Sequence, residues 1–209
     1  MNKEEAEYYG EYTEILTYTE QEILKELNDI LDELTEDPER SPYEHIISRI
    51  KSPESVRDKL RQKGFADDVL TGIIKLSDVI GIRVVTHFVG DIYLILSKLR
   101  EHEAWEIVKE KDYIARPKEN GYRSYHVILK VPVCREDDFT KSKDFPDSLN
   151  IEIQLRTIAM DCWAALEHQI RYKKDVKNTT LIADELKRCA DEMASTDLTM
   201  QTIRDVLMK

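Results

Sequence analysis

The sequence predicts one domain of the α/β or α+β class, in which helices flank a mixed β-sheet. Segments that are rich in β-branched residues or strictly alternating fall between residues 80 and 156, whereas helical periodicity dominates both ends of the chain. The length of 209 residues and the hydrophobic content of 41% suit one globular domain with helical extensions. A chain of this size buries about 70% of its unfolded surface, which is enough for a core without disulfides.

The N-terminal part of the sequence has a helical pattern. Residues 19–36 repeat apolar side chains at helical spacing, with Thr19 as the N-cap and a glutamate three residues later that completes a capping box. A proline at position 38 ends this helix. The Ser41-Pro42 pair, a capping residue followed by proline at the first helical position, predicts that a second helix begins here.

The middle of the sequence changes from helical to strand character. The Ser52-Pro53 pair predicts a helix that runs to about Lys63 and is stopped by Gly64. Residues 80–86, with their β-branched run, predict a buried strand.

The rest of the chain supplies more strands and then returns to helix. Residues 90–101 have a helical pattern. Three further strands are predicted, at residues 105–113, 124–133 and 149–155. The polar residues 134–148 predict a loop between two paired strands, and the pattern is helical from Thr157 to the end.

The charge balance limits the classes of partner. A formal net charge of −11 argues against general binding to DNA or RNA, whose phosphates favour basic surfaces. Basic residues nevertheless gather at 49–63 and 109–123, which suits a phosphate-rich small ligand held in a basic site on an acidic body. The sequence leaves room for RNA binding but gives it no support.

Sequence features also bear on the compartment. No apolar run approaches the ~18 residues of a membrane span, and the first residues lack the apolar stretch of a signal peptide. Cys134, Cys162 and Cys189 are odd in number and widely spaced, which fits neither a disulfide framework nor a zinc site. We therefore expect a cytoplasmic protein without membrane contact, in which Cys162, beside a tryptophan in an apolar helix, is a buried thiol.

The first candidate site is the basic segment at residues 49–59. Arg49 and Lys51 are two positions apart in an extended stretch, so their side chains point the same way. Ser55 and Lys59 are four positions apart on the following helix and share a face. Two cations, a hydroxyl and the free N–H groups of a helix start suit an anion, although a solvated basic helix start also explains the pattern.

A second candidate site is formed by carboxylates next to predicted strands. Asp78 leads into the strand that carries Arg83, and Gly81 between them allows a backbone or ligand to approach closely. In the last predicted strand, alternation places Glu152 on the polar face, together with Gln154 and an arginine. Each feature alone also fits a turn or a solvated face, but two carboxylates on neighbouring strands would hold Mg²⁺ together with substrate phosphates.

The segment 111–126 combines four cations, three tyrosines and an Asn120-Gly121 pair that fits a hairpin turn. Tyrosine rings stack on nucleobases, while lysine and arginine bind their phosphates. The segment after it, from Met160 to His168, predicts a helix whose apolar side, including Leu166, faces the core and whose first turn lies near the carboxylate strand.

Taken together and in this order, these segments resemble the synthetase domain of the RelA/SpoT homologue family, and most closely its short, single-domain small alarmone synthetases. The matching stretches are RIKSPESVRDKL, DVIGIRV, DYIARPKENGYRSYH and EIQLRTIAMDCWAALEH, within about residues 40–175. The resemblance implies a nucleotidyltransferase-like fold. It also implies transfer of the β,γ-pyrophosphate of ATP to the 3′-hydroxyl of GDP or GTP, which gives (p)ppGpp and AMP.

The resemblance also implies roles for individual residues. The ATP site would consist of Arg49 and Arg83 around the adenine and Lys51, Ser55 and Lys59 on the phosphates. Asp78 and Glu152 would bind Mg²⁺, and Glu152 would also accept the proton of the attacking hydroxyl. The guanine nucleotide would meet Lys111, Lys118, Asn120, Tyr122, His126, Gln154, Asp161 and Glu167, with Tyr122 stacked on the base.

The same resemblance suggests a homotetramer and a division into N-terminal helices (1–48), a catalytic sheet (49–156) and C-terminal helices (157–209). The His-Asp metal pair of the hydrolase domain in long members does not occur in the sequence. Two alternatives share these motifs. One is a toxic relative that pyrophosphorylates adenine nucleotides or tRNA, and the other is a nucleotide-binding module without catalysis.

Overall fold

The computed structural model describes residues 3–35, 41–133, 145–171 and 179–207. Five strands form one sheet in the order β1-β2-β5-β4-β3. Their bounds are β1 Tyr43–Ile50, β2 Ile80–Thr86, β3 Glu106–Asp112, β4 Tyr125–Pro132 and β5 Ser148–Thr157. β2 and β5 run parallel, while the β1–β2, β5–β4 and β4–β3 pairs are antiparallel, so the predicted mixed sheet is confirmed.

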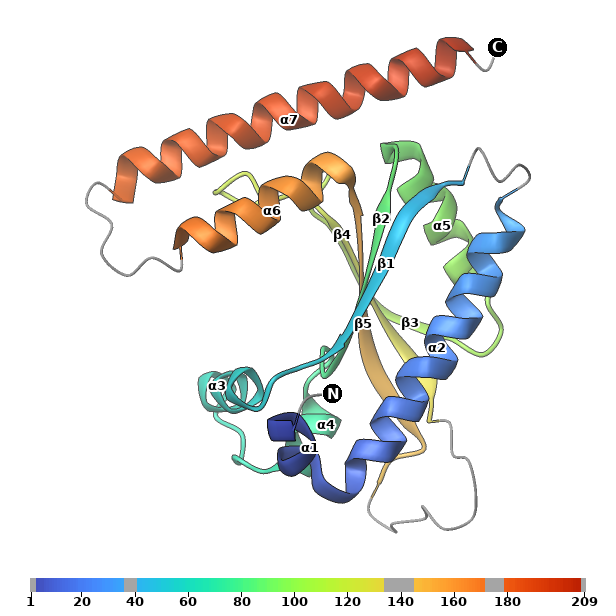
Figure 1. Ribbon diagram of the computed structural model, residues 1–209, viewed down its shortest axis with the longest axis vertical. Coiled ribbons are helices and arrows are strands. Elements are labelled where there is room, and N and C mark those ends of the chain that lie inside the picture. Colours follow the sequence, from blue (N-terminus) through green and yellow to red (C-terminus); the bar gives the residue numbers. More distant parts are fainter. Residues whose placement is uncertain (1–2, 36–40, 134–144, 172–178, 208–209) are drawn as a thin grey trace.

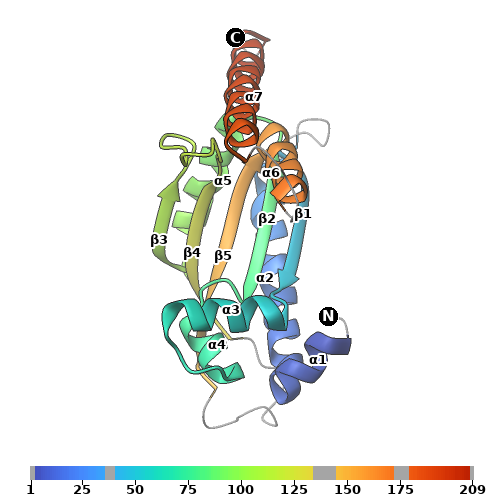
Figure 2. The ribbon, with the colours of Figure 1, turned by 90° about the vertical axis from the view of Figure 1, so that its left-hand side faces the viewer.

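Helices lie on both faces of this sheet. The helical segments are α1 Lys3–Tyr9, a short 3₁₀ turn Gly10–Tyr12, α2 Thr13–Glu33, α3 Pro53–Lys63, α4 Val69–Lys75, α5 Val89–Glu101, α6 Ile158–Arg171 and α7 Thr179–Leu207. α2 and α5 cover one face, while α3 and α6 stand at opposite ends of the other (Figure 1). Figure 2 looks onto that second face and shows the strands running between α3 and α6.

The packing of β5 in the core explains why the sheet face opposite α2 and α5 is polar. On β5, Ile151, Ile153 and Leu155 are fully buried on the α2–α5 side. Because side chains alternate along a strand, Glu152 and Gln154 must point to the opposite face. The predicted alternation is therefore confirmed.

Local signals at the start of α3 are also confirmed. The Ser52 side chain accepts a hydrogen bond from the backbone N–H of Ser55, and Pro53 occupies the first turn. Gly64 ends the helix in the left-handed region at a φ of 70°, which glycine adopts without a steric penalty.

Two predictions in the N-terminal region are wrong. The segment after Ser41-Pro42 is strand β1 and not a helix, because it pairs along its length with β2, where Arg49 lies opposite Gly81. Thr19 does not cap a helix, since α2 already begins at Thr13 and Thr19 is 0% exposed inside it. In the first case inter-strand hydrogen bonds outweigh a local capping pattern. The short helix α4 had no sequence prediction.

Helix α6 differs in part from its predicted packing. Met160 and Trp163 are buried, and the Trp163 indole donates to the Leu186 carbonyl of α7 at 2.8 Å. Cys162 is exposed and Leu166 is 50% exposed, so the predictions of a buried thiol and of a core-facing leucine are wrong. The helix turns about 100° per residue, so only a narrow stripe can face α7.

Helix α7 is fixed to the body by polar contacts. The Thr157 hydroxyl donates to Asp197 at 2.6 Å, and the Gln201 side chain accepts from the Gly90 N–H at 2.8 Å. Arg204 forms an ion pair with Asp91 at the start of α5. Within the described ranges, no helix is both long and apolar enough to cross a membrane.

We predict that Asp91→Ala loosens α7. Asp91 is 1% exposed and accepts from both Arg204 and the Phe88 N–H. Losing these bonds should cost about 1.5–3 kcal/mol and speed amide hydrogen exchange across residues 179–207. Arg188→Gln, which removes exposed pairs on the same helix, serves as the control. Unchanged exchange in the Asp91 variant would contradict the anchoring role.

Candidate active site

The first part of the site is a carboxylate that two lysines share. Asp78 lies in the turn before β2, and its Oδ2 accepts hydrogen bonds from the Lys51 and Lys59 ammonium groups, each at 2.7 Å. Lys51 follows β1 and Lys59 lies on α3, so three elements meet here. Burial raises the pKa of Asp78, but the hydrogen bonds from both lysines outweigh burial, so the pKa lies below its usual value and the group is ionised.

A divalent cation fits this carboxylate. The second oxygen of Asp78, Oδ1, is buried without a hydrogen-bond partner among the described atoms. Asp78 is also near enough to Glu152 for its charge to act on that carboxyl group. The described residues contain no cluster of three or more His, Cys, Asp or Glu side chains that could hold a metal. The carboxylates of Asp78 and Glu152 suit Mg²⁺, which takes one or two carboxylates and completes its shell with phosphates and water.

The second part of the site surrounds Glu152 on β5. The Gln154 amide nitrogen lies 2.8 Å from one Glu152 oxygen, and His126 Nδ1 on β4 lies 3.1 Å from the other. Burial raises the pKa of Glu152, but the hydrogen bonds from His126 and Gln154 lower the pKa by more than burial raises it. The pKa of Glu152 is therefore below its usual value. Glu152 is therefore a carboxylate at neutral pH, able to bind a metal or accept a proton.

Arg156 links this carboxylate to the start of α6. Its guanidinium donates to Gln154 Oε1 at 2.7 Å, to the Tyr122 hydroxyl at 2.8 Å and to Asp161 at 3.0 Å. Asp161 also accepts from Arg83 on β2, at 2.9 Å. One continuous hydrogen-bond network thus contains Glu152, His126, Gln154, Arg156, Tyr122, Asp161 and Arg83.

The connection between β3 and β4, residues 113–124, brings tyrosines to this network. The Lys118 ammonium lies 4.8 Å from the Tyr113 ring centroid and 4.7 Å from that of Tyr122. The Gly121 N–H donates to the Lys118 carbonyl at 2.8 Å, and Gly121 has a φ of 88°. The Asn-Gly pair is therefore a turn, but it lies inside a long connection and does not directly join the two strands.

Other predicted residues lie at the edges of the site. Asn120 donates to Glu167 on α6 at 3.3 Å. Lys111 is exposed on β3 and lies opposite His126 in the register. The Ser55 hydroxyl accepts a hydrogen bond from the Ser52 hydroxyl at 2.9 Å.

The register also defines a space beside Glu152. Gly81 on β2 lies between Arg49 of β1 and Glu152 of β5. A Cβ at Gly81 would meet no atom within 4 Å, and Arg49 is exposed. The missing side chain leaves room on the polar face between a cation and a carboxylate, in agreement with the predicted close approach at this glycine.

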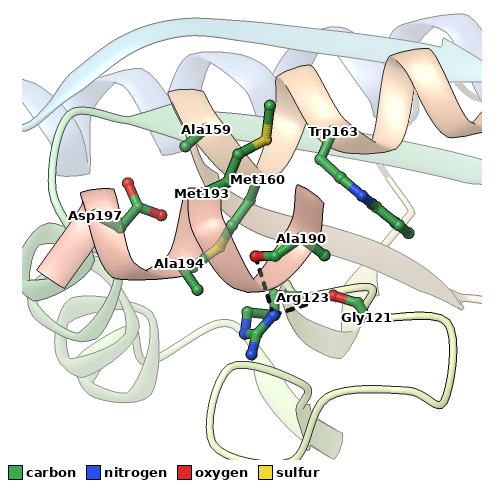
Figure 3. A pocket seen from close by; sticks show the side chains of 9 residues that line it. All are labelled: Gly121, Arg123, Ala159, Met160, Trp163, Ala190, Met193, Ala194 and Asp197. Atoms are coloured by element: carbon green, nitrogen blue, oxygen red, sulfur yellow. Dashed lines mark hydrogen bonds between the residues drawn. The ribbon is translucent and has the colours of Figure 1, made fainter. Parts of the chain in front are cut away.

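Helix α7 packs against the tyrosine-bearing connection, residues 113–124. Arg123 donates to the carbonyl groups of Gly121 and Ala190, each at 3.3 Å, and a Cβ on Gly121 would stand 2.6 Å from that of Ala190 (Figure 3). The cavity between these residues and Trp163 measures about 10 Å³, which is room for at most one water molecule. It is a packing defect and not the ligand site.

Two residues of the site had no assigned role in the sequence interpretation. Alternation predicts Arg156 on the polar face of β5, but an arginine on such a face can equally be solvated. Tyr113 was one of three tyrosines in the segment, and only the folded connection turns its ring against those of Tyr122 and His126.

The sheet is mixed, one carboxylate lies before β2, a second lies on the adjacent β5, and lysines lie beside the first. These features define the nucleotidyltransferase-like class. Residues 48–177 match the family model described as "Region found in RelA / SpoT proteins". The chain belongs to the RelA/SpoT family.

Two curated relatives come from Bacillus subtilis (strain 168). The chain is 43% identical over 153 residues to GTP pyrophosphokinase YwaC, covering 72% of this chain and 69% of the relative. It is 31% identical over 166 residues to GTP pyrophosphokinase YjbM, covering 79% and 74%.

Two solved protein structures from the same organism resemble most of the chain. The crystal structure of small alarmone synthetase 2 has a TM-score of 0.76 at 36% identity and covers 91% of this chain and 96% of that one. Small alarmone synthetase 1 bound to its product pppGpp has a TM-score of 0.79 at 28% identity, with coverage of 95% and 96%. The predicted nucleotidyltransferase-like fold is confirmed.

We predict that Gly81→Val preserves folding but impairs nucleotide binding. The new side chain would fill open space beside Glu152, and overfilling a site that a ligand needs costs about 1–3 kcal/mol. This corresponds to a rise of about 5- to 150-fold in the dissociation constant. Titration with a fluorescent ATP analogue, together with thermal unfolding, measures both quantities.

Gly72→Val provides the matched contrast on α4. There a Cβ would stand 2.8 Å from the Val56 side chain in the core, so stability should fall instead. Tight nucleotide binding by the Gly81 variant would show that the space serves no ligand.

Proposed function

We propose that this protein synthesises (p)ppGpp by transferring the β,γ-pyrophosphate of ATP to the 3′-hydroxyl of GDP or GTP, with release of AMP. The observation that carries the proposal is the ionised Glu152, held by two donors beside the lysine-bound Asp78. The names of the curated relatives, GTP pyrophosphokinases, support it. So does the small alarmone synthetase solved with pppGpp.

The ATP would occupy the side of the face next to α3. Lys51 and Lys59 would exchange their bonds to Asp78 for bonds to the phosphates, and Ser55 at the helix start adds a hydroxyl and a backbone N–H. Arg49 and Arg83, on neighbouring strands, would hold the adenine by stacking.

Mg²⁺ would be held by Asp78 and Glu152. The unpartnered Oδ1 of Asp78 offers a free ligand position without breaking a lysine bond. When bound, the ion would neutralise the phosphates that carry the developing charge, which is the main requirement of phosphoryl-group transfer.

The acceptor nucleotide would lie between the tyrosine-bearing connection and α6. Tyr122 would stack on guanine, while the α6 carboxylates Asp161 and Glu167 would accept from the N–H groups of the base. Lys111 and Lys118 are assigned to the acceptor phosphates, with His126 beside them through its contact with Glu152. Asn120, Gln154, Asp161 and Glu167 are assigned to the base and its surroundings.

Glu152 would accept the proton of the attacking 3′-hydroxyl. A carboxylate is a weak base for an alcohol, so general-base catalysis would contribute only about 10²–10⁴-fold. Most of the rate would come from alignment of the two nucleotides and from the cations around the transferred group. No covalent intermediate on the protein is required.

We also propose that the chain assembles as a homotetramer, as its resemblance to small alarmone synthetases implies. Helix α7 carries exposed apolar side chains that an interface would bury: Leu198, Met200, Ile203, Val206 and Leu207. Light scattering after size exclusion measures the mass directly, and a monomer at all concentrations would contradict this assembly.

The activity is tested with Mg²⁺, ATP labelled in its γ-phosphate, and GDP, GTP, ADP or uncharged tRNA in turn. We expect label on guanine nucleotides and release of AMP. Label on ADP or tRNA would instead indicate the toxic type of relative. No transfer to any acceptor, with nucleotide binding intact, would indicate a binding module.

We predict that Glu152→Gln abolishes turnover but largely preserves nucleotide binding. The amide keeps the size of the side chain but loses the negative charge that binds the metal and accepts the proton. Turnover is measured with the labelled ATP, and binding by calorimetry with GDP. Glu110→Gln, an exchange of a carboxylate paired with Arg100 away from the site, is the control. Undiminished turnover in Glu152→Gln would exclude this mechanism.

A further inference from the structure

A closed ring of hydrogen bonds joins Glu152 to four other side chains. Its members are Arg156, Tyr122, His126, Glu152 and Gln154. The four links outside the imidazole–carboxylate contact measure 2.7–2.8 Å, and that contact measures 3.1 Å. The side chain of Arg156 is 8% exposed, so water does not compete freely for its guanidinium.

The direction of each bond follows from donor chemistry. A guanidinium can only donate, and one Arg156 nitrogen contacts both the Tyr122 hydroxyl and Gln154 Oε1. Gln154 must therefore present its oxygen to Arg156 and its NH₂ group to the carboxylate. Both ends of the amide agree with this orientation, because a carboxylate can only accept.

The same reasoning applies to the other branch. The Tyr122 oxygen accepts from Arg156, so its proton is available for the nitrogen 2.8 Å away, His126 Nε2. In a neutral imidazole the other nitrogen then carries the hydrogen. Nδ1–H of His126 points to Glu152, as the carboxylate requires. Both branches thus begin at Arg156 and end as donors to Glu152.

We propose that Arg156 is the positioning residue of this site, because through Tyr122–His126 on one side and Gln154 on the other it holds both oxygens of Glu152 in a fixed orientation. The proposal rests on the proposed function, in which Glu152 meets the reacting hydroxyl. It extends that function by giving the Tyr122 hydroxyl a task separate from the ring that stacks on guanine. Arg156 touches no substrate in this arrangement and acts through its neighbours.

Contacts of His126 and Arg156 with residues outside the ring also restrict the orientations of these two side chains. The ring of Tyr113 packs edge-on against His126, with centroids 5.2 Å apart, and limits the orientations that the imidazole can adopt. Asp161 accepts from another nitrogen of Arg156 and holds the guanidinium plane from the opposite side. The guanidinium also lies over the Tyr122 ring, 5.3 Å from its centroid.

Two variants interrupt the ring at different points. Arg156→Gln removes both branches, and Tyr122→Phe removes one hydroxyl while keeping the aromatic face. Arg100→Gln and Tyr93→Phe are matched controls, because Arg100 pairs with Glu110 and the Tyr93 hydroxyl donates to Asp112, away from the ring. Thermal unfolding of each variant establishes that it is folded.

The kinetic readout separates positioning from binding. Outer residues that orient a functional group are typically worth about 10–100-fold, so we expect kcat to fall by about this factor in Arg156→Gln. In Tyr122→Phe we expect kcat to fall by about tenfold while KM for GDP stays nearly constant, since the stacking face remains. A raised KM with unchanged kcat in Tyr122→Phe would overturn the proposal.

A spectroscopic readout does not depend on activity. In the nucleotide-free protein, proton–nitrogen NMR should show a slowly exchanging Nδ1–H on His126, assigned by its absence in His126→Gln. We expect this signal to persist in both controls. In Tyr122→Phe, and in a folded Arg156→Gln variant, we expect the signal to disappear because the proton exchanges rapidly with water. An unchanged signal in Tyr122→Phe would overturn the ring. If the wild-type protein makes no alarmone but shows this pattern, the proposed function fails and the ring stands.

Discussion

The parallel pairing of β2 with β5 is the constraint on which the site depends. It places Gly81 beside Glu152 and Arg83 beside Gln154, although these residues are about a third of the chain apart. Because neighbouring side chains in register point to the same face, the pairing puts the turn that carries Asp78 and the polar side of β5 at one location. Without it, each charged group would belong to a separate solvated strand.

Partly buried charges on this face are acceptable only because each has a partner. Removing a charged group from water is costly unless it is paired and hydrogen-bonded. Lys51 and Lys59 share Asp78, while Arg83 and Arg156 share Asp161. The same pairs keep the cations in place before any nucleotide binds. In the proposed function, nucleotide binding would then exchange one anionic partner for another and would not require the site to be built anew.

Segments outside the family-matched range 48–177 contribute to this arrangement. The buried hydroxyl of Tyr9 on α1 donates to the Lys51 carbonyl at 2.6 Å and so fixes the backbone that carries a phosphate-binding candidate. Helix α7 supports the proposed acceptor side, where Ala190 packs against Gly121 in the tyrosine-bearing connection. The terminal helices therefore stabilise both sides of the sheet to which the proposed function assigns a substrate.

The sequence by itself determined the mixed sheet, the cap of α3 at Ser52 and the polar face of β5, because these depend on periodicity and on contacts within a few residues. It also identified Asp78 and Glu152 as candidates by residue type. Only the tertiary structure decided that the segment after Pro42 is a strand, because inter-strand pairing overrides a local helix start. It likewise decided that Arg156 joins Tyr122 to Gln154, since a side chain's partners across strands depend on register, which no local pattern encodes.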